Sequence, residues 1–175
     1  MTTLYVLRHG IAAERGAAGR DDSERPLTPD GEKKVRQVAK ALRRLEVEFD
    51  VLLTSPFARA LRTAQIVAQV FDAKKKLEVC DDLAVGGDPE AVVGRLQRRH
   101  KSAETVMLVG HEPYLSELVS MLLTGHPGLP LNLKKGGLCK LSVTRVRYGR
   151  CATLEWLLTP RVLAGLPGLD VNRKK

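Results

Sequence analysis

Short apolar runs alternate with longer amphipathic segments over the first two thirds of the chain, and this pattern indicates strands followed by helices. The apolar runs predict strands at 4–7, 51–53, 77–80 and 105–109. A helix is expected after each strand, at about 29–45, 56–71, 89–100 and 113–123. Strands and helices that alternate at this spacing form βαβ crossovers, so we expect a mainly parallel sheet.

The expected helix starts are marked by residues that cap a first turn. Thr28 precedes Pro29, which is typical of an N-cap followed by the first helical position. The pairs Ser55–Pro56 and Asp88–Pro89 predict two further helix starts in the same way. These local signals agree with the strand pattern and favour an α/β fold.

The last third of the chain has a different pattern. Residues 138–146 and 152–158 alternate or run apolar around a Tyr-Gly-Arg turn, which indicates an antiparallel hairpin. We therefore predict a three-layer α/β/α sandwich, with a mostly parallel sheet and an antiparallel edge hairpin. Because no linker is long enough to divide the 175 residues, we expect one domain over 1–160 and a basic tail over 161–175.

Composition limits the cellular location and the cysteine chemistry. No apolar stretch approaches the roughly 20 residues of a transmembrane helix, and the N-terminus lacks a signal-peptide core. We therefore expect a cytoplasmic protein without membrane association. Cys80, Cys139 and Cys151 are odd in number and lack metal-ligand spacing, so reduced thiols are the simplest interpretation.

The net charge of +9 raises the question of an acidic partner. Basic residues are spread over the chain, apart from short runs at 74–76 and 173–175. Aromatic residues are only 4% of the chain, so they supply few platforms on which single-stranded bases could stack. The charge therefore favours a solvated surface or a phosphorylated protein partner over nucleic acid.

Three polar motifs follow three of the predicted strands. Arg8–Gly10 ends the first strand, Ser55–Arg59 follows the second, and Gly110–His111 follows the strand at 105–109. In an open parallel sheet the C-terminal ends of the strands lie on one side, where ligands bind. The topology therefore predicts that two histidines and two arginines, His9 and His111 with Arg8 and Arg59, meet in one pocket.

Such a group of side chains suits a phosphoryl dianion. Arginine presents a planar fork of N–H groups to phosphate oxygens. A histidine beside two guanidinium groups keeps a depressed pKa because a third positive charge is unfavourable, and its ring nitrogen stays free to attack phosphorus. Gly10 permits close backbone approach, and the helix expected near Pro56 directs its positive end at the anion, with Ser55 as a cap or phosphate donor.

Four blocks at these places resemble the histidine phosphatase superfamily, which has a phosphoglycerate mutase-like fold. Within that superfamily they are most similar to the SixA-type phosphohistidine phosphatases. The blocks are Leu7–Ala12, Arg25–Thr28, Ser55–Ala60 and Val109–His111, in the order of the family. Segments 133–137 and 156–160 are also similar, so the resemblance spans nearly the whole chain.

The resemblance implies a mechanism. His9 would be the nucleophile and would carry the phosphoryl group in a covalent intermediate. Arg8, Arg59 and His111 would hold the phosphoryl oxygens and stabilise the transition state, and Arg25 would complete the rim. No metal ion and no other cofactor is implied.

One departure from the family concerns the acid that protonates the leaving group. Members that cleave phosphate esters commonly carry this acid shortly after the third strand, where this chain has Val85. The carboxylates left as substitutes are Asp81, Asp82, Asp88, Glu90 and Glu112. A phosphohistidine substrate needs little help, because imidazole has a pKa of about 6.5 and departs readily once protonated. The missing acid therefore favours a P–N bond over a P–O bond.

These observations together predict a metal-independent phosphohydrolase that acts on protein phosphohistidine. Its partner would be a phosphorylated protein such as a histidine phosphotransfer domain, and its pocket would bind phosphate or vanadate. Two alternatives stay open: a small-molecule phosphomonoesterase that acts on a sugar phosphate or similar compound, and a non-catalytic module that binds phosphate or nucleic acid. The nucleophile at His9 argues against the second alternative, because binding alone does not require one.

Overall fold

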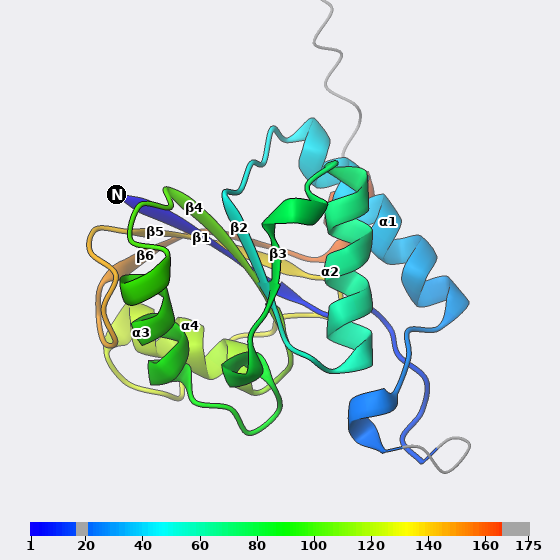
Figure 1. Ribbon diagram of the computed structural model, residues 1–175, viewed down its shortest axis with the longest axis horizontal. Coiled ribbons are helices and arrows are strands. Elements are labelled where there is room, and N and C mark those ends of the chain that lie inside the picture. Colours follow the sequence, from blue (N-terminus) through cyan, green and yellow to red (C-terminus); the bar gives the residue numbers. More distant parts are fainter. Residues whose placement is uncertain (17–20, 166–175) are drawn as a thin grey trace, which may run out of the picture.

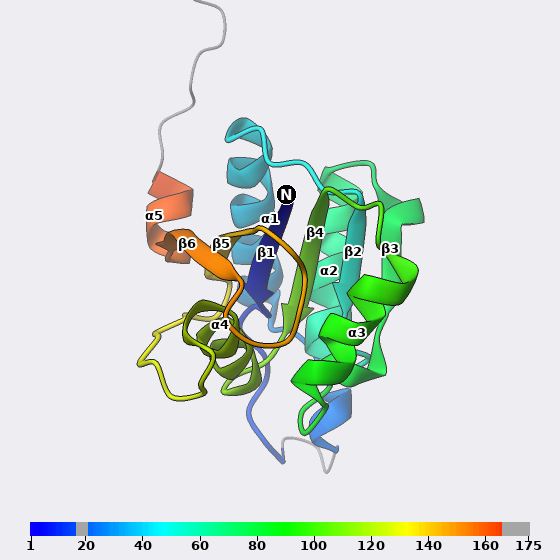
Figure 2. The ribbon, with the colours of Figure 1, turned by 90° about the vertical axis from the view of Figure 1, so that its left-hand side faces the viewer.

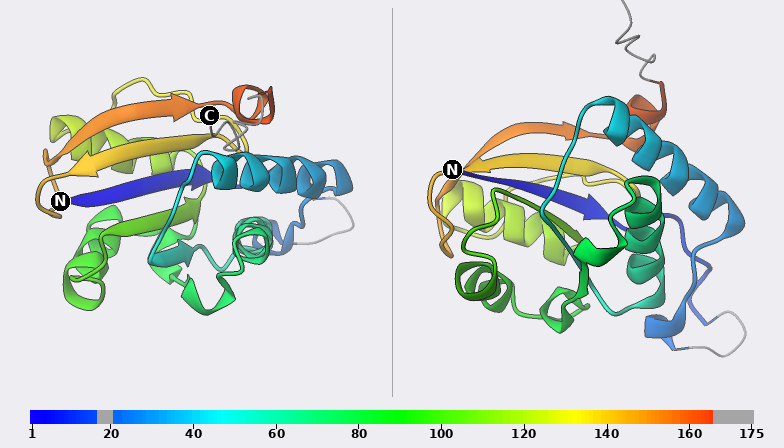
Figure 3. Two further views of the ribbon diagram at one scale, coloured as in Figure 1. Left: turned by 90° about the horizontal axis from the view of Figure 1, so that it is seen from above. Right: turned by 45° about the horizontal axis from the view of Figure 1, so that its top comes forward.

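A six-stranded mixed sheet forms the centre of the protein in the computed structural model, which describes residues 1–16 and 21–165 (Figure 1). The strands lie in the order β3-β2-β4-β1-β5-β6. Their bounds are β1 (Thr2–Arg8), β2 (Val51–Thr54), β3 (Leu77–Val79), β4 (Thr105–Gly110), β5 (Leu138–Val143) and β6 (Ala152–Leu158). The left view of Figure 3 shows β4 (green), β1 (blue), β5 (yellow) and β6 (orange) side by side in this order.

Four of the strands run parallel, as their sequence pattern predicts. β1 pairs with β4, β4 with β2, and β2 with β3, all in parallel. β5 and β6 form an antiparallel pair, and β5 also pairs antiparallel with β1. The predicted α/β sandwich with an antiparallel edge hairpin is therefore confirmed, with β6 as the edge strand.

Helices cover both faces of the sheet and make it the middle layer of three (Figures 1 and 2). α1, α2 and α5 lie on one face, whereas α3 and α4 lie on the other. Their bounds are α1 (Pro29–Arg44), α2 (Ala58–Val70), α3 (Pro89–Arg99), α4 (Tyr114–Thr124) and α5 (Pro160–Gly165). Three short 3-10 helices lie in the connections: η2 (Asp22–Glu24), η3 (Lys74–Lys76) and η4 (Asp81–Leu83).

Alternate residues of the central strands enter two separate cores. In β1, Leu4 and Val6 belong to the core under α3 and α4. Tyr5 and Leu7 point the other way, into the core under α1 and α2. Because both faces of the strand are buried, apolar residues occupy successive positions, and the strand is visible in the sequence as a continuous apolar run.

Two of the predicted helix starts are confirmed. The Thr28 hydroxyl accepts a hydrogen bond from the Gly31 N–H at 2.9 Å, at the start of α1. The Asp88 carboxylate accepts one from the Glu90 N–H at 2.8 Å, at the start of α3. In both helices a side-chain oxygen therefore satisfies an N–H group of the first turn that has no partner within the helix.

The prediction that Ser55–Pro56 starts α2 is wrong. α2 begins at Ala58, and its N-cap residue Phe57 makes no side-chain capping bond. The backbone of Ser55 still belongs to the sheet, because its N–H donates to the Val109 carbonyl at 3.0 Å. The chain therefore needs two further residues to leave the sheet before a helix can begin.

The packed structure extends beyond the predicted domain boundary at residue 160. α5 lies against α1, and its residue Leu163 is fully buried in the core of that face. The beginning of the predicted basic tail is therefore part of the folded domain. The remainder of that tail, 166–175, lies outside the described residues.

None of the helices within residues 1–16 and 21–165 is both long and apolar enough to cross a bilayer. The three cysteines are free thiols, and Cys80 and Cys139 are buried. The register of the hairpin places Cys139 opposite Leu157, so Cys151 is not its cross-strand neighbour.

Leu163→Ala should lower the free energy of unfolding by about 2–5 kcal/mol, because it removes a fully buried side chain and leaves a cavity beneath α5. Val162→Ala is the matched control, since Val162 is 46% exposed and its loss should cost less than about 0.5 kcal/mol. Urea unfolding of the two variants measures the difference. Equal stabilities would mean that α5 does not belong to the cooperative fold.

Candidate active site

The C-terminal ends of β1, β2 and β4 lie next to one another, as the predicted topology requires. Arg8 at the end of β1 pairs with Gly110 of β4, and Thr54 at the end of β2 pairs with Val109 of β4. His9, Ser55 and His111 are the next residues of the three strands. The sheet register therefore brings together residues up to 102 positions apart, the separation of His9 from His111.

The backbone of His9 is held on both sides. Its N–H donates to the Gly110 carbonyl at 3.1 Å, and its carbonyl accepts from the Gly136 N–H at 3.0 Å. The next residue, Gly10, donates its N–H to the Thr63 hydroxyl at 3.1 Å. β4, the segment before β5 and α2 therefore all determine where the His9 side chain lies.

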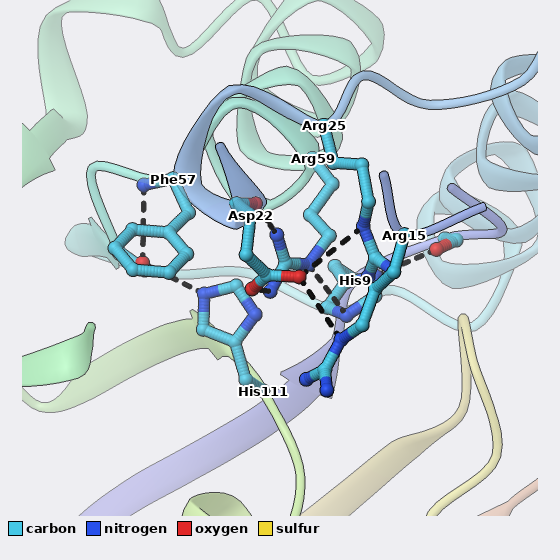
Figure 4. A network of polar contacts seen from close by, with 9 residues as sticks. His9, Arg15, Asp22, Arg25, Phe57, Arg59 and His111 are labelled. Carbon is cyan, nitrogen blue, oxygen red and sulfur yellow. Dashed lines mark hydrogen bonds and ion pairs between the residues drawn. The ribbon is translucent and has the colours of Figure 1, made fainter. Parts of the chain in front are cut away.

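The orientation of the His9 ring defines its tautomer. Nδ1 lies 2.7 Å from the Gly10 carbonyl oxygen, which can only accept a hydrogen bond. The proton of the neutral ring is therefore on Nδ1, and Nε2 keeps its lone pair. Arg59 Nε donates to this Nε2 at 3.3 Å, so the lone pair faces a guanidinium group (Figure 4).

His111 lies beside His9, with 5.0 Å between the ring centroids. Its Nε2 is 2.8 Å from Ser55 Oγ, and that hydroxyl oxygen also accepts a hydrogen bond from the Phe57 N–H. The Ser55 hydroxyl has its proton available for His111 Nε2, and when it donates there the imidazole proton lies on Nδ1. This buried Nδ1 has no hydrogen-bond partner among the described residues, so it can donate to an incoming anion.

Three predicted arginines surround the two histidines. The Arg59 side chain is only 3% exposed. Arg8 Nη1 donates to the Leu133 carbonyl at 2.9 Å, whereas its buried Nε has no hydrogen-bond partner within residues 1–16 and 21–165. Arg25 Nε lies 3.5 Å from the Asp22 carboxylate and likewise makes no hydrogen bond in the described part of the chain. The site therefore offers several N–H donors to an anion.

Burial and the surrounding positive charges keep both histidines neutral. Burial is the main cause that lowers the pKa of His9 to about 3, against the opposing effect of the hydrogen bond to the Gly10 carbonyl. The positive charges of Arg59 and Arg8, and that of His111 once it is protonated, also lower this pKa. Burial and the charge of Arg59 likewise lower the pKa of His111 to about 4. His9 is therefore an unprotonated base at neutral pH, as a nucleophile must be.

Two charged residues that we did not predict complete this network. The Asp22 carboxylate lies 2.8 Å from Arg59 Nη2 and 3.2 Å from Arg15 Nε (Figure 4). Both residues belong to the polar loop between β1 and α1. The spacing of Asp22 and Arg25, three residues apart, could have indicated the ion pair that they form. No local sequence pattern indicated that the loop would turn toward Arg59 of α2.

Thr63 is a further residue that the sequence analysis did not identify. Its hydroxyl donates to the Arg59 carbonyl at 2.7 Å while it accepts from the Gly10 N–H. Thr63 is completely buried, so water does not compete for the hydrogen bonds of this hydroxyl. It therefore joins the first turn of α2 to the backbone beside His9.

The carboxylates considered as general acids are mostly engaged or exposed. Asp88 caps α3, and Glu112 accepts a hydrogen bond from the Ser116 hydroxyl. Val85, at the position of the family's acid, is 46% exposed and cannot ionise. The carboxylate that lies against Arg59 belongs instead to Asp22, whose pKa is lowered. Burial alone would raise that pKa, but the hydrogen bond from Arg59 and the neighbouring charges outweigh it.

Within the described ranges, no group of three or more histidine, cysteine, aspartate or glutamate side chains is placed to hold a metal ion. The positive charge that faces His9 and His111 comes from guanidinium groups. These groups are chemically suited to bind phosphate oxygens directly.

The sequence comparisons define the class of protein. The family model described as histidine phosphatase superfamily (branch 1) matches residues 4–84. The phosphohistidine phosphatase SixA of Escherichia coli (strain K12) is 33% identical over 158 residues, which cover 90% of this chain and 93% of SixA. The chain therefore belongs to the histidine phosphatase superfamily, and these similarities support a phosphatase function.

Other similar proteins extend this result. An uncharacterised protein of a Picosynechococcus strain is 40% identical over 139 residues, which cover 79% of this chain and 83% of that protein. Among solved structures, the protein histidine phosphatase SixA complexed with tungstate superposes with a TM-score of 0.79 at 28% identity, over 91% of this chain and 98% of that one. A phosphoserine phosphatase of Entamoeba histolytica, at 18% identity and a TM-score of 0.68 over 93% of this chain and all of that one, shares the fold.

The lowered pKa of His9 predicts that the protein loses stability in acid. Below pH 6.5 the unfolded chain binds a proton at this position that the folded protein binds only near pH 3, so the free energy of unfolding falls as the pH falls through this window. At pH 5 the contribution of His9 should be about 1–2 kcal/mol. Unfolding by urea at pH 7.5 and 5.0 should show a smaller loss for His9→Asn than for the wild type.

His126→Asn is the matched control, because His126 is exposed. This variant should lose as much stability between the two pH values as the wild type does. If His9→Asn also behaves like the wild type, the buried ring of His9 is not the cause of the acid sensitivity.

Proposed function

We propose that this chain is a metal-independent phosphatase that removes phosphoryl groups from protein phosphohistidine by way of a phosphoryl-His9 intermediate. The observation that carries this proposal is the geometry of His9. Its Nδ1 is bound to the Gly10 carbonyl, and its Nε2 is an unprotonated base that faces Arg59. A buried imidazole with this tautomer and a lowered pKa is suited to nucleophilic attack on phosphorus.

The reaction takes place in two steps of the same kind. In the first step, the lone pair of His9 Nε2 attacks phosphorus as the P–N bond to the substrate breaks, and the substrate's imidazole leaves with the bonding electrons. Its other ring nitrogen carries a proton, so the leaving group is neutral. In the second step, water attacks phosphorus, the bond to His9 breaks, and orthophosphate and a proton are released. The proton of His9 stays on Nδ1 throughout, where it is hydrogen-bonded to the Gly10 carbonyl.

The other site residues supply charge and orientation. Arg8 and Arg59 bind the phosphoryl oxygens and balance their charge, and Arg25 contributes from the rim. His111 donates from Nδ1 as a neutral imidazole. Ser55 acts through His111, because the serine is fully buried and its hydroxyl already contacts that ring. We therefore assign Ser55 to positioning, in place of the direct phosphate contact expected from the sequence.

The leaving group distinguishes phosphohistidine from phosphate esters. An alkoxide must be protonated as it leaves, whereas an imidazole that is already protonated on its second nitrogen need not be. The only carboxylate for which the described structure records an ion pair with Arg59 is Asp22, and its low pKa makes it a poor proton donor at neutral pH. The site therefore favours cleavage of a P–N bond.

The similarity to SixA of Escherichia coli, a phosphohistidine phosphatase, supports the same substrate class. A phosphorylated protein, such as a histidine phosphotransfer domain, is a suitable partner for a chain with a net charge of +9. One SixA structure is complexed with tungstate, an oxyanion similar to phosphate, and this supports binding of phosphate and of its analogue vanadate by the present chain.

His9→Ala should abolish turnover of a phosphohistidine protein, because it removes the nucleophile. Rapid quenching of the wild type should trap a phosphoryl group on His9 that is labile to acid and stable to base. Mass spectrometry of the quenched protein checks the site, and turnover is measured in the presence of EDTA to test independence from metal ions. His126→Ala, which removes an exposed histidine, is the control and should keep full activity.

Two results would contradict this mechanism. Substantial turnover by a correctly folded His9→Ala variant would exclude His9 as the nucleophile. Activity that disappears with EDTA and returns with a divalent ion would show that the arginines do not supply the charge alone.

The wild type should hydrolyse phosphohistidine about 10²- to 10⁴-fold faster than phosphoserine, the range that general acid catalysis typically contributes. Aryl phosphates, whose leaving groups are less basic than an alkoxide, should fall between the two. The measurement is kcat/KM for a phosphohistidine protein, a phosphoserine peptide, an aryl phosphate and a panel of sugar phosphates. Equal rates for phosphohistidine and an alkyl ester would favour the small-molecule phosphomonoesterase instead.

A further inference from the structure

The Asp22 carboxylate lies within a cluster of guanidinium groups. It is 2.8 Å from Arg59, 3.2 Å from Arg15 and 3.5 Å from Arg25. The backbone carbonyl of Asp22 also accepts a hydrogen bond from Arg59 Nη1. Figure 4 shows the carboxylate between these arginines and the ring of His111. One acidic residue of the β1–α1 loop therefore contacts most of the positive charge of the site.

The contacts of Arg59 show that Asp22 uses donors that a phosphoryl group would need. Arg59 Nε faces His9 Nε2, while its two terminal nitrogens are bound to Asp22. A phosphoryl group attached to His9 Nε2 would replace the contact between Nε2 and Arg59 Nε, and its oxygens would need the terminal nitrogens of the same guanidinium group. Arg59 Nη1 donates to the backbone carbonyl of Asp22, and only Nη2 donates to the carboxylate. A phosphoryl oxygen would bind this Nη2 in place of the carboxylate oxygen, so the two anions compete for it.

We propose that Asp22 is the resting anion of the catalytic site, which the phosphoryl group displaces on entry and which returns as orthophosphate leaves. This inference rests on the proposed function, in that the entering anion is a phosphoryl group. The Asp22 carboxylate would therefore compete with the substrate, with the product and with inorganic phosphate analogues for the same guanidinium group.

The exposure of Asp22 makes such an exchange feasible. Its side chain is 33% exposed, whereas that of Arg59 is 3% exposed. The carboxylate can therefore rotate into water, while the arginine stays in place and receives the new anion. Ion pairs at partly exposed positions are individually weak. Displacement of the Asp22 carboxylate should therefore weaken the affinity for the entering anion by only about three- to tenfold.

Competition between Asp22 and the entering anion has an effect on anion affinity that a purely structural role of Asp22 would not have. If only a fraction of molecules have an open site, every anion binds more weakly by that same fraction. Removal of the competitor should then tighten the binding of all anions by one common factor. A residue that merely oriented Arg59 would have the opposite effect, since its loss would weaken binding.

The test is to measure the dissociation constants of orthophosphate and tungstate by calorimetry at fixed ionic strength. Asp22→Asn keeps the size of the side chain and removes its charge, and we expect both constants to fall together by about three- to tenfold. Asp22→Ala should have the same effect. Asp21→Asn removes the same charge at the neighbouring exposed position and should change both constants less than about twofold.

The outcomes separate this inference from the function on which it rests. Unchanged or weaker binding by both Asp22 variants, with normal binding by the wild type, would overturn the role of Asp22 and leave the phosphatase mechanism intact. If the wild type and all the variants failed to bind either anion, the proposed phosphate site would be wrong, and this inference with it. A second measurement in the same variants is product inhibition, which should become stronger by the same factor.

Discussion

The position of the His9 imidazole depends on the backbone of Gly10, where the structure leaves no room for a side chain. A Cβ atom there would lie 2.5 Å from Val35 Cγ2, because α1 packs directly on this residue. The carbonyl of Gly10 accepts a hydrogen bond from His9 Nδ1, and its N–H donates to the Thr63 hydroxyl of α2. One small residue thus joins β1 to α1 and α2 and sets the tautomer of His9. A larger residue would have to displace the Val35 side chain of α1 and would disturb the His9 ring at the same time.

The charge of the site follows from this arrangement. Burial makes protonation of His9 and His111 unfavourable, and the neighbouring guanidinium groups make it more so. The site therefore combines neutral bases with permanent cations, a combination that binds phosphate without neutralising the nucleophile. The Asp22 carboxylate balances part of this positive charge through its ion pair with Arg59.

Most of the fold, and the meeting of the main site residues, could be predicted from sequence. The strands are buried on both faces, so apolar residues occur in continuous runs, and helices between them require parallel pairing. Parallel strands end on the same side, which is why Arg8, His9 and His111 could be placed together before their distances were known. The start of α2 could not be predicted, because Ser55–Pro56 satisfies the local pattern of a cap while the sheet retains the N–H of Ser55.

The sequence by itself determined the elements, their order and the identity of the phosphate-binding residue types, since these depend on periodicity and on side-chain chemistry. Only the tertiary structure decided which ring nitrogen of His9 faces Arg59, and that Asp22 reaches Arg59 across 37 residues. It also decided that Leu163 of α5 is buried in the core under α1 and α2, beyond the expected end of the domain. Such contacts join residues far apart in the chain, and no local pattern of hydrophobic and polar positions specifies the path of the loops that bring them together.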